Sequence, residues 1–335
     1  MSRAQLTSTV EQNTGGAVAP FVAGKNLLVN GNFEIAQRGT SGFTSGYTLD
    51  RWTVLTGVTA SISQQSTGTP NGSRYCLRST MTSTGGVMNF GQLLETSTAA
   101  NAWGKTIIFS VLLRRNSSFA GALNINIDKS ATVDAGTGAT WTNLTNVTTS
   151  NANLPTGTGA SNWYLATATV AIPNDGTANS IKISISQTAT ETSGAYYEVA
   201  QAQLEVGPVA TPFSRAGGTL SGELTACQRY YFRFGGNDVY QNFCTGIGNT
   251  AAIAKGFMLF PVPMRVAPTL MDFSTLATTD NDSYTNSFSG LTFDRASINS
   301  ARLNITGGSG MTNKQMTFIV ANNSTSAYLG FSAEL

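Results

Sequence analysis

Alternation of hydrophobic and polar residues dominates much of the chain. Residues 122–128, 163–172 and 180–186 place apolar side chains at every second position. Because successive side chains of a β-strand point to opposite faces of a sheet, this period predicts strands with one buried face. Residues 106–113 instead form a nearly continuous apolar run, which is typical of a central strand that is buried on both faces.

Turn-forming residues separate these runs and indicate the fold class. Further strands are predicted at residues 51–55, 74–78 and 196–206, with glycine, asparagine and proline between them. The chain holds 35 glycines, which supply the positive backbone φ angles that tight corners need. Several short strands with such punctuation predict an all-β protein, built as a sandwich or a barrel.

Two segments interrupt this pattern. Residues 130–159 are nearly all Thr, Ser, Asn, Gly and Ala, so we expect a long loop there, which Trp141 and Leu144 could pin. Residues 222–231 are predicted to hold the one short helix. The strand pattern then returns at residues 257–262, 303–305, 316–320 and 327–335.

Chain length and a glycine pair predict the domain organisation. A chain of 335 residues exceeds the roughly 100–200 residues of a common domain, so two domains are expected. The pair Gly217-Gly218 marks the boundary, which gives a first domain at residues 26–216 and a C-terminal β-sandwich domain at residues 217–335. Residues 1–25 are polar with scattered apolar side chains, which favours an arm that orders against a partner over a frayed tail.

The surface of this protein must be largely uncharged. Charged residues make up 11% of the chain, against roughly 25% in an average protein. Aromatic residues reach 9% and the net charge is only +2, which favours a folded chain over a disordered one. Sheet edges with so little charge are poorly protected against pairing with other chains. Burial between identical subunits removes this problem, so we predict a symmetric homo-oligomer.

Several functional classes are excluded by composition. The longest basic run is Arg114-Arg115, which is too short for the clustered cationic surface that nucleic acids require. The chain has no histidine, which removes His-based nucleophile dyads and His-ligated zinc. Its first residues show no apolar stretch of a signal peptide. No window approaches the run of about 20 apolar residues that spans a membrane, so we expect synthesis in the cytoplasm and no membrane insertion.

The cysteines do not form a disulfide scaffold. There are three, Cys76, Cys227 and Cys244, and this count is odd and low. We expect buried, reduced thiols, because cysteine commonly serves as a small buried apolar residue. A single Cys227–Cys244 bridge is the alternative.

Both ends of the first predicted domain carry motifs that resemble a known class. Residues 26–34 resemble the opening strand of carbohydrate-binding-module jelly rolls of the galactose-binding-like type. Residues 37–39 (Gln-Arg-Gly) and 50–52 (Asp-Arg-Trp) continue the version found in phage proteins. Residues 198–207, followed by Thr-Pro-Phe at residues 211–213, resemble the last strand of the same class of domain. The resemblance implies a jelly-roll β-sandwich at residues 26–216.

The remaining motifs resemble phage fibre proteins. Residues 227–231 read Cys-Gln-Arg-Tyr-Tyr, a segment that follows the jelly roll in such fibres. Residues 261–265, residues 267–269 and a last strand at residues 329–335 are similar to their short C-terminal tip domain. The order and joint presence of these motifs over residues 26–335 resemble a bacteriophage fibre or tail-fibre protein.

This resemblance implies a function. It implies a structural component of the virion that attaches to glycans of the host surface. Residues 1–25 would dock on other virion proteins, the C-terminal end would face outward, and the homo-oligomer would be a trimer, the symmetry favoured for a fibre. A purely structural capsid or tail decoration protein, and a free carbohydrate-binding lectin, are the alternatives.

The jelly-roll resemblance also makes a structural metal site a candidate. In that class a glutamate in the position of Glu34 helps to bind a structural calcium ion together with an acid of a late strand, here Glu198 or its neighbour Glu205. Calcium takes six to eight oxygen ligands. The late strand carries Gln201 and Gln203 where acids are common, which weakens the case. We therefore expect no cofactor, with a structural calcium at Glu34 and Glu198 as the alternative.

Aromatic residues outside the core are the candidates for sugar binding. Core packing is the competing role for each, because aromatic side chains bury large areas. Trp141 lies in a polar segment and is the first ligand-binding residue that we predict, and Tyr240 is also predicted. The wider candidate set is Tyr47, Trp103, Trp141, Trp163 and Tyr240.

Enzymatic chemistry is not indicated by the sequence. A glycosidase needs two carboxylates about 5–10 Å apart, and none of the 17 acidic residues lies in a recognisable catalytic segment. Asp272, Asp280 and Asp282 lie in a Thr/Ser/Asn-rich stretch, where aspartate is first a turn former. Glycine pairs such as Gly235-Gly236 lack the lysine of a phosphate-binding loop. We predict a binding protein rather than an enzyme.

Overall fold

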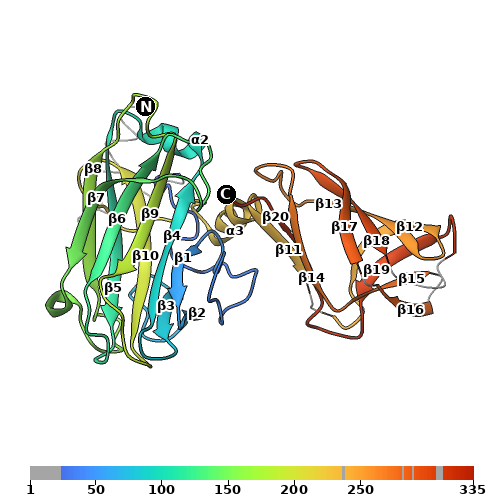
Figure 1. Cartoon of the computed structure of the whole chain (residues 1–335), viewed down its shortest axis with the longest axis horizontal. Coiled ribbons are helices and arrows are strands. Elements are labelled where there is room, and N and C mark those ends of the chain that lie inside the picture. The colour runs from blue at the N-terminus through green and yellow to red at the C-terminus, as the bar shows by residue number, and fades with distance from the viewer. Residues whose placement is uncertain (1–23, 236–237, 281–282, 289, 307–311) are drawn as a thin grey trace, which may run out of the picture.

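The computed structural model describes residues 24–235, 238–280, 283–288, 290–306 and 312–335. The chain forms two β-rich units side by side, with the C-terminus between them (Figure 1). The N-terminal sandwich holds β1 to β10 and the C-terminal unit holds β11 to β20. The predicted all-β fold class, a jelly-roll sandwich followed by a smaller β-domain, is confirmed. No helix in the described part of the chain is long and apolar enough to span a membrane.

Two five-stranded antiparallel sheets face each other in the N-terminal sandwich. One sheet has the order β1 (Thr53–Val58), β4 (Val87–Leu94), β9 (Ser180–Gln187), β6 (Leu123–Ser130) and β7 (Thr142–Thr149). The other has the order β2 (Ala60–Gln65), β3 (Cys76–Met81), β10 (Tyr196–Val206), β5 (Thr106–Arg115) and β8 (Tyr164–Ala171). Short helical turns join them, namely α2 (Thr96–Ala99), η1 (Ala100–Ala102) and η2 (Asn151–Asn153).

Large aromatic side chains fill the space between these two sheets. The ring centroid of Trp52 lies 5.0 Å from that of Phe33 and 5.8 Å from that of Phe90. Phe90 in turn stacks on Tyr197 at 6.2 Å. All four side chains are fully buried, and such tilted and offset ring pairs add to the stability that burial provides.

The segment before β1 differs from the expected opening strand. Residues 26–34 form mostly turns, held by two backbone hydrogen bonds to β10, from the Leu27 amide and to the Gly31 carbonyl, and by side chains. The Asn30 amide donates to the carbonyls of Ile35 at 2.8 Å and Asp50 at 3.0 Å, and its oxygen accepts from the Ile35 amide. Asn30 has φ +59°, a value that asparagine adopts more readily than most residues in a turn.

The prediction of a long loop at residues 130–159 is wrong, because β7 lies within this range. This strand consists of threonine and asparagine apart from Leu144 and Val147, which pack against the core. It is the edge strand of its sheet, so one ladder and two apolar side chains suffice to hold it. A bulge opposite Ile127 and Asp128 further obscures its period of two.

The C-terminal unit has a small and a large antiparallel sheet. The small sheet has the order β11 (Tyr231–Gly235), β20 (Tyr328–Ser332) and β14 (Leu270–Ser274). The large sheet has the order β16 (Ser283–Ser287), β15 (Leu276–Asp280), β19 (Met316–Ala321), β12 (Asn242–Thr250), β13 (Ile253–Leu259), β18 (Ser300–Thr306) and β17 (Gly290–Ala296). Asp272 and Asp280 therefore belong to strands, and Asp282 lies outside the described residues. Phe331 packs against Phe260 at 5.1 Å within the core of this unit.

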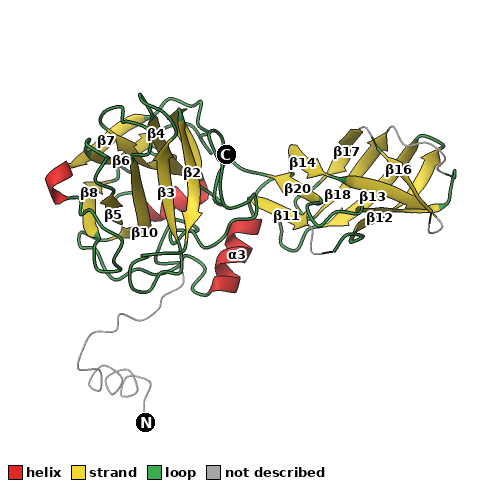
Figure 2. Ribbon diagram, turned by 90° about the horizontal axis from the view of Figure 1, so that it is seen from below, coloured by secondary structure: helices red, strands yellow, loops and turns green. Residues whose placement is uncertain are grey.

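A short helix, α3 (Leu220–Gln228), lies between the two units (Figure 2). It begins where Thr219 accepts a hydrogen bond from the Gly222 amide, which is a common N-cap. The sequence predicted this helix, although Tyr231 begins β11 instead of ending it. All three cysteines, including Cys227 of α3, are free and buried as expected, and burial raises the thiol pKa of each.

Candidate functional site

The outer face of the sheet β1-β4-β9-β6-β7 carries a continuous set of polar side chains. Asn126 of β6 lies opposite Ser184 of β9 and Asn146 of β7. Two residues earlier in β6, Asn124 lies opposite Ser186 of β9 and Thr148 of β7. The alternate positions Ile125, Ile127, Ile183 and Ile185 point into the core, so the polar set must point outward. We call it the amide face: Asn124, Asn126, Asp128, Asn143, Asn146, Thr148, Lys182, Ser184 and Ser186.

Hydrogen bonds between neighbouring strands fix the orientation of these side chains. The Asn126 amide nitrogen lies 3.3 Å from Ser184 Oγ and 3.2 Å from Ser186 Oγ. Thr148 Oγ1 donates to Asn124 Oδ1 at 2.7 Å. Each amide and hydroxyl has both donor and acceptor capacity, so these bonds leave sites for a ligand. The result is a preorganised, nearly uncharged set of groups, in which Asn143, Asn146 and Thr148 are exposed, whereas Asn126 and Ser184 are buried beneath them.

Trp141 lies at one end of the amide face, immediately before β7. Its ring centroid is 4.8 Å from Lys182 Nζ, and its indole nitrogen donates to the Gly136 carbonyl at 3.2 Å. Lys182 also forms an ion pair with Asp128 at 3.0 Å, and Asn143 donates to the same carboxylate at 2.7 Å. The half-buried indole is thus fixed next to a charged pair.

This arrangement suits a ligand with hydroxyl groups on an apolar ring. Amides, hydroxyls and one carboxylate can exchange hydrogen bonds with hydroxyl groups. A tryptophan offers a large flat apolar surface with a polar edge. Binding sites for small molecules commonly combine an aromatic surface with a few fixed polar groups.

The other predicted aromatic residues have different surroundings. Tyr240 is exposed in a turn of the C-terminal unit, so the structure does not bring it near Trp141. Trp103 packs against the core and donates to the Ala178 carbonyl at 2.7 Å. Trp163 lies under the guanidinium of Arg114 at 4.3 Å. The ligand-binding roles of Trp141 and Tyr240 stay predictions.

The two glutamates considered for calcium have arginine partners. Glu34 forms a bidentate ion pair with Arg215, at 2.5 and 2.7 Å. Buried Glu198 lies between Arg78, at 2.7 Å, and Arg114. Within the described residues, no group of three or more Cys, Asp or Glu side chains is close enough to hold a metal ion. The oxygens of both carboxylates are therefore directed at guanidinium groups.

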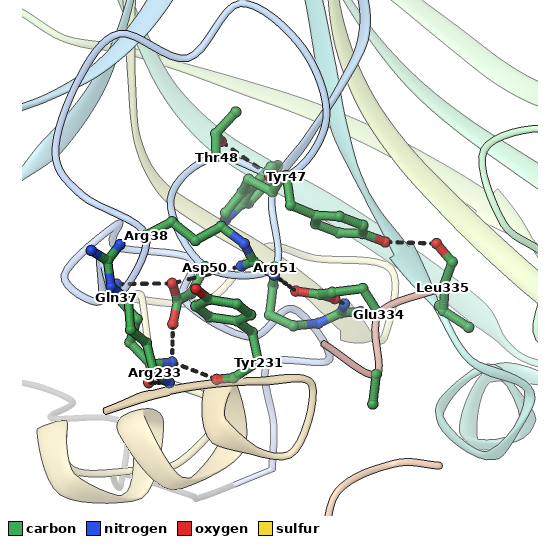
Figure 3. Close-up of polar contacts among 12 residues, drawn as sticks. Gln37, Arg38, Tyr47, Thr48, Asp50, Arg51, Tyr231, Arg233, Glu334 and Leu335 are labelled. Carbon is green, nitrogen blue, oxygen red and sulfur yellow. Dashed lines mark hydrogen bonds and ion pairs between the residues drawn. The ribbon is translucent and has the colours of Figure 1, made fainter. Parts of the chain in front are cut away.

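A polar cluster, which no pattern in the sequence predicted, lies at the junction of the two units (Figure 3). Buried Arg51 of the sandwich forms an ion pair with Glu334, and Arg38 reaches the same carboxylate at 3.4 Å. Tyr47 donates to the main-chain oxygen of Leu335 at 3.0 Å. Burial raises the pKa of Tyr47 to about 12. These contacts tie the last residues of the chain to the N-terminal sandwich.

Asp50 lies at the centre of this cluster. The backbone and side chain of Gln37 both donate to its carboxylate, and Arg38 lies 4.0 Å away. Burial raises the pKa of Asp50 to about 6, against the opposing charge of Arg38. Arg51, adjacent to Asp50 in the sequence, has its carboxylate partner, Glu334, 283 residues away. No local sequence signal reveals such a pair.

Comparisons with known proteins place the chain among distant structural neighbours. No family model and no curated protein sequence matches it. The chain is similar to the CBM22-1 xylan-binding domain of Paenibacillus barcinonensis Xyn10C, with 12% identity, a TM-score of 0.33, and coverage of 56% of this chain and 98% of that domain. The chain is also similar to TmCBM61, solved in complex with β-1,4-galactotriose, with 14% identity and a TM-score of 0.34. That match covers 54% of this chain and 99% of the other chain.

A phage protein is also among these neighbours. The enzymatically active domain of tailspike protein 4 of bacteriophage CBA120 shares 10% identity at a TM-score of 0.36. The match covers 54% of this chain but only 21% of the tailspike chain. At such levels of similarity, function must be inferred from the residues of the chain itself.

Proposed function

We propose that this protein is a non-enzymatic glycan-binding protein that uses the amide face and Trp141. The observation that carries the proposal is the fixed set of amides and hydroxyls on β6, β7 and β9 beside the half-buried indole. A pyranose ring would stack on Trp141 while its hydroxyl groups exchange hydrogen bonds with the exposed side chains of Asn143, Asn146 and Thr148. Each such contact is weak, so specificity would come from their joint geometry.

The residues of the amide face support binding rather than hydrolysis. Glycoside hydrolysis uses two carboxylates on opposite sides of the scissile bond. Asp128 is the one acidic side chain of the amide face, and Lys182 and Asn143 both engage it. A single ion-paired carboxylate suits the orientation of a bound sugar.

We further propose that the protein acts as a phage fibre or tail-fibre subunit in the virion. The motifs at residues 26–39, 50–52, 198–213 and 227–231 support this assignment. A homotrimer attached through residues 1–25, of which residues 1–23 lie outside the described part of the chain, would present three copies of the amide face. Avidity would then turn weak single-site binding into firm attachment to a host glycan.

Glycan binding can be tested with four variants on an array of bacterial and plant polysaccharides. Trp141→Ala and Asn143→Ala should each abolish or strongly reduce binding, whereas Tyr240→Ala should retain it. Thr169→Ala, on the exposed outer side of β8, is the matched control for the opposite sheet. Loss of binding in Tyr240→Ala but not in Trp141→Ala would move the site to the C-terminal unit. Silence of the wild-type protein on the array would favour a purely structural role.

A further inference from the structure

A cavity lies where the two units meet, lined by residues that take no part in the amide face. It has a volume of about 300 Å³. Residues 36, 37 and 39 of the sandwich form one side, and Arg233, Gly235 and residues 325–328 of the C-terminal unit form the other. Both units therefore contribute to it, and the contacts of Glu334 and Gln37 hold the two sides together.

Arg233 is the charged group of this cavity. Its guanidinium carbon lies 3.4 Å from the centroid of the Tyr328 ring, which fixes the plane of the guanidinium. The other arginines at the junction have acidic partners: Arg38 and Arg51 with Glu334, Arg229 with Glu95, and Arg265 with Asp134. Among the described residues, no carboxylate lies within 4.0 Å of the Arg233 side chain. This guanidinium is positioned but unpaired.

The acids nearest to the cavity are already engaged. Asp50 accepts hydrogen bonds from Gln37, and Asp272 accepts from the Tyr231 hydroxyl at 3.0 and 3.1 Å. Gln37 cannot turn toward a ligand, because its amide nitrogen also donates to the Tyr231 carbonyl at 2.6 Å. The positive charge of Arg233 is therefore the feature of the cavity that a ligand would meet first.

Other groups of the lining suit a sugar. Thr325 and Ser326 expose hydroxyl side chains at the cavity, and these can donate or accept hydrogen bonds. Gly39 has φ +119°, and a side chain there would meet nothing within 4 Å, so space is open beside it. A volume of about 300 Å³ is at the small end of ligand pockets, which suits one monosaccharide.

We propose that this interdomain cavity binds a sugar carboxylate, as carried by a hexuronic acid. The planar guanidinium fork of Arg233 matches the two oxygens of a carboxylate, and charge-assisted pairs of this kind are stronger than neutral hydrogen bonds. Thr325 and Ser326 would contact ring hydroxyl groups. The site is separate from the amide face and would add a preference for acidic polysaccharides.

Calorimetric titration with glucuronate, glucose and acetate tests this site in the full-length protein. Glucuronate should bind, and glucose and acetate should each bind at least about ten-fold more weakly, because each lacks one of the two recognised features. Arg233→Gln should weaken glucuronate binding by about ten-fold or more, and Arg233→Lys by less, since it keeps the charge but loses the fork. Arg295→Gln removes an exposed arginine of β17 and is the matched control.

Each other outcome would overturn the proposal. Equal binding of acetate and glucuronate would mean a plain anion site, and equal binding of glucose would mean that Arg233 is not used. An equal loss in Arg295→Gln would indicate a general charge effect. Trp141→Ala separates the two sites, because it should leave glucuronate binding at Arg233 unchanged whether or not the amide face binds glycans.

Discussion

Arg265 of the C-terminal unit forms an ion pair with Asp134 of the N-terminal sandwich at 3.0 Å. The same guanidinium donates to the main-chain oxygens of Ala333 at 2.8 Å and Glu334 at 3.0 Å. One side chain therefore holds the last residues of the chain and the opposite unit at the same time. This makes the junction a built interface rather than a flexible linker.

Arg265→Ala should destabilise the protein. The change removes the guanidinium donor from two carbonyl oxygens and from Asp134 Oδ2, at a cost of about 1–3 kcal/mol in the free energy of unfolding. Arg302→Ala is the control, because it breaks an exposed ion pair with Asp294, where about 0–1 kcal/mol is expected. Urea unfolding of both variants measures the difference. Equal effects would show that the junction adds no stability.

Glu334→Ala should have a larger effect. Glu334 is the partner of the buried Arg51, whose charge would be left uncompensated in a site with little water. Removal of one partner of a buried ion pair typically costs about 3–5 kcal/mol. A double-mutant cycle with Arg51→Met separates the pair from each single change. Additive effects in this cycle would mean that Arg51 and Glu334 do not interact.

Asp50 should make stability depend on pH. Burial raises its pKa to about 6 in the folded protein, against about 3.9 in an unfolded chain. The folded state therefore binds a proton more tightly than the unfolded state, so the contribution of Asp50 to stability is greatest below about pH 4 and falls as the pH rises to about 6. The charge of Arg38 lowers the pKa of this carboxyl and the charge of Glu334 raises it, so these two residues set the size of the change.

The comparison with Asp50→Asn isolates this contribution. The variant lacks the titrating carboxyl group but keeps an amide of the same shape. Relative to the variant, the wild-type protein should lose up to about 3 kcal/mol of unfolding free energy between pH 4 and pH 7. Parallel stability curves for the two proteins would contradict an elevated pKa of Asp50.

The junction should also influence Trp141. Asp134 and Gly136 belong to one short loop: Asp134 binds Arg265, Gly136 lies next to Leu335, and its carbonyl accepts the Trp141 indole proton. Loosening this loop with Arg265→Ala should weaken glycan binding at the amide face by about two- to five-fold. The measurement is the dissociation constant of an oligosaccharide that binds the amide face, compared between Arg265→Ala and the wild type. Arg302→Ala, which does not touch the loop, should bind like the wild type.

Patterns of period two, together with one continuous apolar run, predicted the strands that carry the hydrophobic core. The runs at residues 106–113, 122–128 and 180–186 lie in β5, β6 and β9, because burial of one or both faces requires apolar residues at fixed positions. The edge strand β7 was not predicted, because its outer residues are threonine and asparagine, as in a loop. Yet these same residues build a third of the amide face, namely Asn143, Asn146 and Thr148.

Sequence could place Trp141 on a polar segment but not beside Lys182. That contact depends on the register of β6 with β7 and β9, which tertiary structure sets. The junction was still harder to foresee. Gln37, Asp50 and Arg51 meet Tyr231, Arg233 and Glu334 only after both units have folded, and their separation in the chain hides the pairing.

The dependence of Arg51 on Glu334 constrains how the two units could be recombined. A chimera that joins this sandwich to an unrelated C-terminal unit would leave the buried guanidinium of Arg51 without the carboxylate of Glu334. A fusion point in the linker before α3 would therefore fail even if each half folds alone. Successful exchange requires that the incoming unit supply its own glutamate at the end of its last strand, or that Arg38 and Arg51 be replaced together with it.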